Sequence, residues 1–107
     1  MMSPQVFHIL LALADQDLHG YAIIADIAAR TGNGVTLTAS TLYAALKRLL
    51  DEGLIEELDE RPEADDARRR YYRITAQGRR AGRAEAARLD ALAQMARSKR
   101  WLPRSGR

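Results

Sequence analysis

The chain has 107 residues, of which 47% are hydrophobic and 29% are charged, and its 17 basic and 14 acidic side chains give a formal net charge of +3. A chain of this length buries one modest core, so we expect a single small domain, with or without an appended helix, and no separate catalytic domain. The absence of cysteine excludes disulfides, thiolate metal sites and thiol nucleophiles. Because the first residues lack a basic signal region and no apolar run reaches about 20 residues, we expect a cytoplasmic protein with no membrane partner.

Two helices are predicted in the first third of the chain. The first begins with Ser3 as N-cap and Pro4 at the first helical position, where a missing N–H costs nothing. Its apolar stripe consists of Val6, Ile9, Leu10 and Leu13. The second helix runs from about Gly20 to Arg30 and ends at the glycine-rich residues 31–34. Its helically spaced apolar residues are Tyr21, Ile24, Ile27 and Ala28. His19 is expected to be a polar helix-entry residue rather than a metal ligand, because no other ligand lies at suitable spacing.

A third helix is predicted between Thr38, its N-cap, and Gly53, which is expected in a left-handed conformation. Its core-facing residues are Leu42, Leu46, Leu49 and Leu50. The opposite face carries Ser40, Thr41, Tyr43, Ala44, Lys47 and Arg48. Small and hydroxyl residues near a helix N-terminus allow close approach to a major groove, and the N–H groups there can meet phosphate. The alternative is an ordinary solvated helix face.

A hairpin follows this helix. Residues 54–58 have strand-like composition, and the returning strand is Tyr71–Ile74. The residues between them are polar and poor in apolar side chains, which favours a wing tip. A plain solvent loop is the alternative.

A long final helix is predicted from Ala76, with Thr75 as N-cap, to about Arg100. Such a helix exceeds the dimensions of a small body, so part of it needs another partner. Its narrow apolar stripe consists of Leu89, Leu92, Met95 and Ala96. Glu85 and Arg88 near the start of the stripe resemble the charged edges that flank a helix pair. We favour self-association through this helix, and the alternative is packing on the first helix of the same chain.

The residues after Ile74 are strongly basic, and only Glu85 and Asp90 oppose this charge. This imbalance permits a polyanionic partner without establishing one.

Three motifs in this order resemble the PadR family of bacterial transcriptional regulators. They are residues 18–23 (LHGYAI), residues 41–49 with 53–55 (TLYAALKRL and GLI), and residues 69–79 (RRYYRITAQGR). The resemblance extends from Phe7 to about Arg100. It implies a mainly helical fold with a small β-hairpin, namely a winged helix-turn-helix over residues 1–75 and a C-terminal dimerisation helix with a basic tail over residues 76–107.

The resemblance also implies a homodimer that binds a double-stranded operator and usually represses transcription. Its two-fold symmetry predicts an inverted-repeat operator. The DNA-binding residues implied or suggested by the pattern are Thr38, Ser40, Thr41, Tyr43, Lys47, Arg68, Arg69 and Arg70. Tyr21 matches a tyrosine that packs between the second helix and its neighbours, so it is predicted to be structural.

Two departures from the family pattern affect this reading. Thr38 and Ala39 stand where the family often has Ser-Pro, which keeps the cap but loses the pre-set proline. The carboxylates of Glu63, Asp65 and Asp66 repel phosphate, so wing contact is expected to depend on the three arginines instead.

Members of the family can hold planar apolar effectors between aromatic side chains at the dimer centre, so Trp101 is a candidate effector-binding residue. A tail aromatic that packs on the dimer is the alternative. No metal or cofactor is expected.

Two other functional classes fit less well. The acidic wing tip favours a winged-helix module that binds another protein rather than DNA. An enzyme is disfavoured because the chain has only two histidines, no glycine-rich phosphate loop, and carboxylates mainly in solvated runs.

Overall fold

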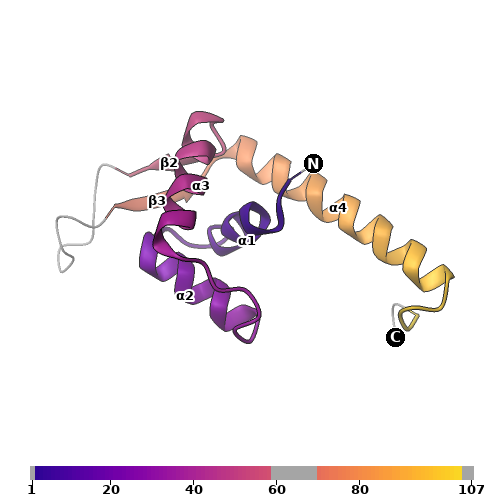
Figure 1. The fold of residues 1–107 in the computed structure, drawn as a ribbon. Helices are drawn as coiled ribbons and strands as arrows, with labels where there is room; N and C mark the ends of the chain where they lie inside the picture. The colour runs from indigo at the N-terminus through magenta and orange to yellow at the C-terminus, as the bar shows by residue number, and fades with distance from the viewer. Residues whose placement is uncertain (1, 59–69, 105–107) are drawn as a thin grey trace.

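The structure is a computed structural model that describes residues 2–58 and 70–104 (Figure 1). In chain order, these residues form α1 (Pro4–Ala12), β1 (Leu18–His19), α2 (Gly20–Arg30), α3 (Ala39–Asp51), β2 (Ile55–Glu57), β3 (Tyr71–Ile74) and α4 (Ala76–Ser98). The predicted bounds of α2 and β3 are confirmed, and α4 ends two residues before the expected position.

Each helix begins at a side chain that caps it. The hydroxyl of Ser3 accepts the N–H of Val6 at 3.2 Å. The hydroxyls of Thr38 and Thr75 accept the N–H groups of Thr41 and Gly78 at 3.2 and 3.0 Å. The imidazole Nδ1 of His19 does the same for Ala22 at 3.2 Å, which confirms its helix-entry role. These bonds satisfy amides that a helix leaves without internal partners, and so they fix where the helices start.

The core lies between α1, α2 and α3 and the sheet. Its buried residues are Ile9, Leu10, Ala12, Leu13, Ile23, Ile27, Leu37, Leu42, Leu46, Leu49, Leu54, Ile55, Tyr72 and Ile74. The predicted packing role of Tyr21 is wrong, since its side chain is 68% exposed. The buried side of α2 passes through Gly20, Ile23 and Ile27, and a residue directly after Gly20 points away from that side.

The sheet has three antiparallel strands in the order β1-β3-β2. Ile55 pairs with Ile74, and Leu18 pairs with Tyr72, so β3 is the central strand. The sequence predicted only the β2–β3 hairpin. The third strand, β1, was missed because it has only two residues, Leu18 and His19, which are too few to show the alternation of apolar and polar side chains that identifies a strand.

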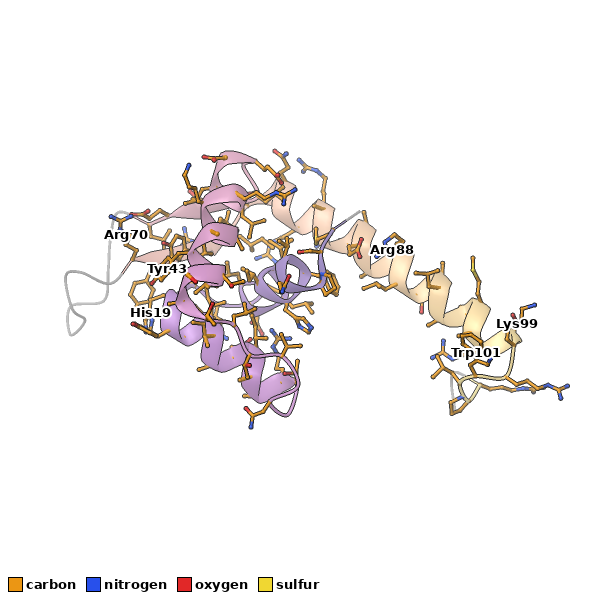
Figure 2. The ribbon with its side chains drawn as sticks, in the orientation of Figure 1. His19, Tyr43, Arg70, Arg88, Lys99 and Trp101 are labelled. Carbon is orange, nitrogen blue, oxygen red and sulfur yellow. The ribbon has the colours of Figure 1, made fainter. Side chains whose placement is uncertain are left out.

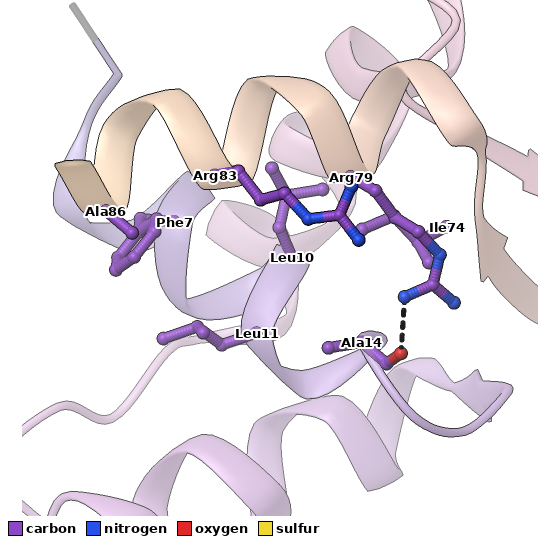
Figure 3. Close-up of a pocket in the computed structure, with 9 residues that line it drawn as sticks. Phe7, Leu10, Leu11, Ala14, Ile74, Arg79, Arg83 and Ala86 are labelled. Carbon is purple, nitrogen blue, oxygen red and sulfur yellow. Dashed lines mark hydrogen bonds between the residues drawn. The ribbon is translucent and has the colours of Figure 1, made fainter.

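Helix α4 starts close to the end of α3 and then leaves the body (Figure 1). The Thr75 hydroxyl donates to the Gly53 carbonyl at 2.7 Å, and Gly53 has the expected left-handed conformation, with φ of 75°. Further along, Arg79 donates to the carbonyl of Ala14 at 2.8 Å, so the first half of α4 is held against α1 (Figure 3). Packing on the first helix is therefore confirmed for this half. The second half projects outward, and the molecule measures 52 × 27 × 25 Å.

Glu85, predicted as a charged edge that flanks a pair of helices, is instead buried within its own chain. Its side chain is buried, and its carboxylate accepts two hydrogen bonds from Arg88, at 2.9 and 2.5 Å. The backbone amide of Met2 also donates to it, and these donors hold the pKa of Glu85 below its ordinary value. Because Met2 lies at the other end of the chain, no helical periodicity could reveal this contact.

Candidate nucleic-acid interface

The N-terminus of α3 presents a compact group of exposed hydroxyls. Thr38 Oγ1 donates to Thr41 Oγ1 at 3.0 Å and lies 3.4 Å from Ser40 Oγ. All three side chains are exposed, and the helix N-terminus places free backbone N–H groups beside them. Such a cluster can donate to a phosphate oxygen and can also accept from, or donate to, a base edge.

Tyr43 lies over the start of α2. A Cβ atom added to Gly20 would come within 2.5 Å of the Tyr43 hydroxyl, so this ring rests directly on the Gly20 backbone. The ring is nevertheless 45% exposed, which leaves one side free for a ligand. Gly20 was not predicted as part of this site. Because glycine has no Cβ, Tyr43 of α3 can approach α2 closely at this position. The sequence signal is a glycine that directly follows the N-cap His19 as the first residue of α2.

The basic residues of the predicted site fall into two groups. Lys47 is exposed one turn beyond Tyr43 on α3, with its Nζ 3.6 Å from Asp51. Arg70 precedes β3 and lies 3.9 Å from Glu57 on β2. Figure 2 shows Arg70, Tyr43 and His19 at the same end of the molecule, the end from which the hairpin extends. Arg68 and Arg69 lie outside the residues that the structure describes.

Aromatic side chains on both faces of β3 join the hairpin to the rest of the domain. The His19 and Tyr71 rings meet edge to face, with centroids 5.3 Å apart. Tyr72, on the other face of β3, is buried, and this burial raises the pKa of its hydroxyl, with a further contribution from the charge of Glu57. Tyr72 belongs to the same buried core as the inward-facing leucines of α3, and β2 also packs against α3. The hairpin is therefore held beside α3, so both elements can present one continuous surface.

A bidentate ion pair fixes the other edge of the sheet. Arg73 on β3 donates to both carboxylate oxygens of Asp17 at 3.2 and 2.8 Å. Its hydrogen bonds lower the pKa of Asp17 and raise that of Arg73, and both groups therefore remain charged across the neutral range. This pair was not predicted, because the two residues are brought together only by the β1–β3 register.

An apolar groove lies between α1 and α4, outside this surface. It has a volume of about 180 Å³, and its floor is apolar with two arginines beside it (Figure 3). Its lining residues are Phe7, Leu10, Leu11, Ala14, Ile74, Arg79, Gly82, Arg83 and Ala86. At the far end of α4, Trp101 is 81% exposed, beside Lys99 (Figure 2). The structure therefore separates Trp101 from the α3–hairpin surface within one chain.

The described part of the chain contains no group of three or more histidine or acidic side chains placed to hold a metal ion. Within the same residues, no helix combines the length and apolar content needed to cross a membrane.

Three comparisons relate this geometry to known proteins. A curated protein from Lysinibacillus sphaericus, named uncharacterized protein X, is 37% identical over 71 residues, which are 66% of this chain and 64% of that protein. The chain thus spans somewhat less than two thirds of this relative's length. A transcriptional regulator from Clostridium thermocellum has a similar fold, with a TM-score of 0.76 and 25% identity, over 92% of this chain and 97% of the other.

Bacillus subtilis PadR, whose structure was solved with operator DNA, shares the fold with a TM-score of 0.69 and 24% identity. That likeness covers 80% of this chain and 48% of the other. The family model for PadR-like transcriptional regulators matches residues 9–84, which include α2, α3, all three strands and the start of α4. The chain therefore belongs to the PadR-like family of transcriptional regulators, and its fold is that family's winged helix.

Proposed function

We propose that this protein is a homodimeric transcriptional repressor that binds an inverted-repeat operator. The observation that carries the proposal is the exposed surface formed by the hydroxyl cluster of α3, Tyr43, Lys47 and the adjoining hairpin residue Arg70. Family membership and the operator complex of Bacillus subtilis PadR support a DNA ligand for this surface. In this proposal residues 1–75 bind DNA, and residues 76–107 form the dimerisation arm and a basic tail.

The side chains have different parts in the proposed complex. Helix α3 enters a major groove, where Ser40, Thr41 and Tyr43 contact base edges and Thr38 keeps the helix start in place. Lys47 and the arginines at positions 68–70 contact phosphates, which set affinity and salt dependence rather than sequence preference. Since Tyr43 also rests on Gly20, its ring can orient α3 and contact DNA at the same time.

Dimerisation is assigned to the projecting half of α4. Leu89, Leu92 and Met95 are 39, 47 and 61% exposed, and Ala96 lies half-buried beside them. Three large apolar side chains on one helix face favour a partner, and a second copy of the same helix can cover them symmetrically. Two copies then present two α3 helices to successive major grooves, with half-sites about one helical turn or a multiple apart.

Release by a planar apolar effector completes the proposal. Trp101 is exposed in the single chain and is therefore accessible to a ring that stacks on it. It is the single tryptophan of the chain, so its fluorescence reports on this event directly. Quenching by planar drugs or phenolic acids, together with a loss of operator binding, is the expected result. Unchanged fluorescence across the panel would remove Trp101 from this role.

The test of the main proposal is selection of genomic DNA fragments by the purified protein. The selection is run at low and at near-physiological salt, because salt weakens binding that depends on phosphate charge alone. We expect one inverted repeat to be enriched at both salt concentrations. If no sequence is enriched, and a protein partner is captured instead, the surface binds protein and the proposal fails.

A further inference from the structure

The surface assigned to DNA carries no excess of positive charge among its described residues. Between residues 38–58 and 70–75, the cations are Lys47, Arg48, Arg70 and Arg73, and the carboxylates are Asp51, Glu52, Glu56 and Glu57. We call the exposed side of α3, β2 and β3 the α3–hairpin face. The end of α4 is the opposite case, because residues 91–104 carry four cations and no carboxylate.

Each cation of the α3–hairpin face lies within 4 Å of a carboxylate. On α3, Lys47 pairs with Asp51 at 3.6 Å, and Arg48 pairs with Glu52 at 3.2 Å. Both carboxylates follow their cations by four residues, which places them on the same side of the helix.

The cations of the hairpin are paired as well. Arg70 lies 3.9 Å from Glu57, and Arg73 binds Asp17 at 2.8 Å. In the first of these pairs the carboxylate belongs to the neighbouring strand, so folding of the sheet brings the two charges together. The face therefore meets DNA with its positive charges already occupied.

Exposed ion pairs of this kind are weak, so a phosphate can displace the carboxylate. The displaced carboxylate still lies near the DNA, and its repulsion opposes binding. An operator offsets this cost with base contacts, whereas a random duplex offers only phosphates. Paired carboxylates thus weaken binding to random sequence more than binding to the operator.

We infer that Asp51 and Glu57 are specificity determinants, which occupy Lys47 and Arg70 in the free protein and so suppress sequence-independent DNA binding. This inference rests on the proposed operator-binding function. The readout of sequence then depends on the uncharged residues Ser40, Thr41 and Tyr43. Specificity arises here from a reduced affinity for wrong sequences as well as from contacts to the right one.

The experiment compares Asp51→Asn and Glu57→Gln with the wild type on the selected operator and on a random duplex of equal length. Each substitution keeps the size of the side chain and removes its charge. On the random duplex, each variant is expected to bind about two- to fivefold more tightly, with a salt dependence steeper by about one phosphate contact. On the operator the gain is smaller, so the ratio of the two affinities falls.

Asp26→Asn is the matched control. Asp26 forms the same type of pair, with Arg30 at 2.7 Å, but it belongs to the second half of α2 and not to α3, β2 or β3. Its variant is expected to leave both affinities within about twofold of wild type. An equal gain in this control would mean that net charge alone governs binding, and the inference would be wrong.

A second comparison tests whether the ion pair itself is responsible. In a Lys47→Gln background, Asp51→Asn is expected to lose most of its effect on the random duplex, because there is no cation left to release. A full effect in that background would show general repulsion and would overturn the pairing mechanism. If an operator is selected and neither carboxylate variant changes binding to random DNA, this inference alone fails, and the proposed function stands.

Discussion

Gly78 shows how one residue fixes the start of α4. It lies in the first turn of α4 and is buried against Leu54, which precedes β2, and Ile74 at the end of β3. A Cβ atom at this position would collide with the backbone carbonyl of Leu54 and would come within 2.8 Å of the Ile74 side chain. Since the obstacle is backbone, a larger residue forces α4 away from the sheet.

Gly78→Ala is therefore expected to destabilise the protein by about 1–3 kcal/mol, measured by urea denaturation at a fixed protein concentration. Gly82→Ala is the matched control on the same helix, because a Cβ atom there meets no atom within 4 Å. This change removes only the flexibility of glycine and is expected to stabilise the helix by about 0.5–1 kcal/mol. Destabilisation of similar size at both positions would show that the contact with Leu54 is unimportant.

Among the elements, local chemistry predicted the helix starts and failed where distant segments meet. The caps Ser3, Thr38 and Thr75 were predicted correctly, because a cap depends on side chains within three residues of it. The return strand, β3, was also predicted, because its tyrosines and isoleucine are residue types that favour strands. The exposed position of Tyr21 was not, because helical spacing alone left two choices for the buried side of α2.

In the candidate interface too, features that depend on local sequence were predicted, and features that depend on contacts between distant segments were not. Exposure of the hydroxyl face of α3 follows from its own periodicity, and it was predicted. The contact of Tyr43 with Gly20 and the Arg73–Asp17 pair depend on packing between elements, and no local pattern encodes them. Glu85 is the strongest example of a contact that local sequence cannot reveal. Its charge predicts a position at the edge of a helix, but Met2, from the other end of the chain, packs against it and helps to bury it.

The buried carboxylate of Glu85 makes the stability of the protein depend on pH. Its donors lower its pKa, so the ionised carboxylate adds stability that is fully present above the ordinary value of 4.5 and is lost as pH falls through the lowered value. Glu85→Gln is therefore expected to lower the melting temperature at pH 7, and the difference from wild type is expected to shrink on acidification below pH 4.5. Thermal melts monitored by circular dichroism at several pH values measure this.

Two controls separate this contact from general charge effects. Asp90→Asn removes an exposed carboxylate from the same helix and is expected to leave the melting temperature nearly unchanged. Met2→Pro removes the donating amide, whereas Met2→Ala keeps it, so the proline variant should melt at the lower temperature. A constant difference between Glu85→Gln and wild type across the pH range would disprove an ionised Glu85 in this role.

In the whole molecule, only the first half of α4 packs against the small core, and the second half projects away from it. The first half of α4 completes the body, and the second half makes no contribution to the buried core. Its leucines and methionine are therefore available for a partner, while the fold does not depend on them. Substitutions in this stripe can therefore test the proposed dimer without disturbing the fold.

Leu92→Glu places a charge in the middle of the exposed stripe, where burial against a second copy would require desolvation of an unpaired carboxylate. The variant is expected to keep its circular dichroism spectrum, to sediment as a monomer, and to lose at least about 100-fold in operator affinity, because two linked half-site contacts become one. Gln94→Glu adds the same charge two residues further on, about 200° around the helix, and should remain dimeric.

Sedimentation and operator titration of the two variants together separate assembly from charge. A monomeric Leu92→Glu that still binds the full operator with wild-type affinity would mean that one chain is the DNA-binding unit, and the inverted-repeat proposal would be wrong. A dimeric Leu92→Glu would move the interface elsewhere on the chain, and the groove between α1 and α4 would then be the next surface to mutate, since it also exposes Leu11. Loss of both dimer and operator binding in Leu92→Glu alone would assign the projecting half of α4 to the pairing of two α3 helices.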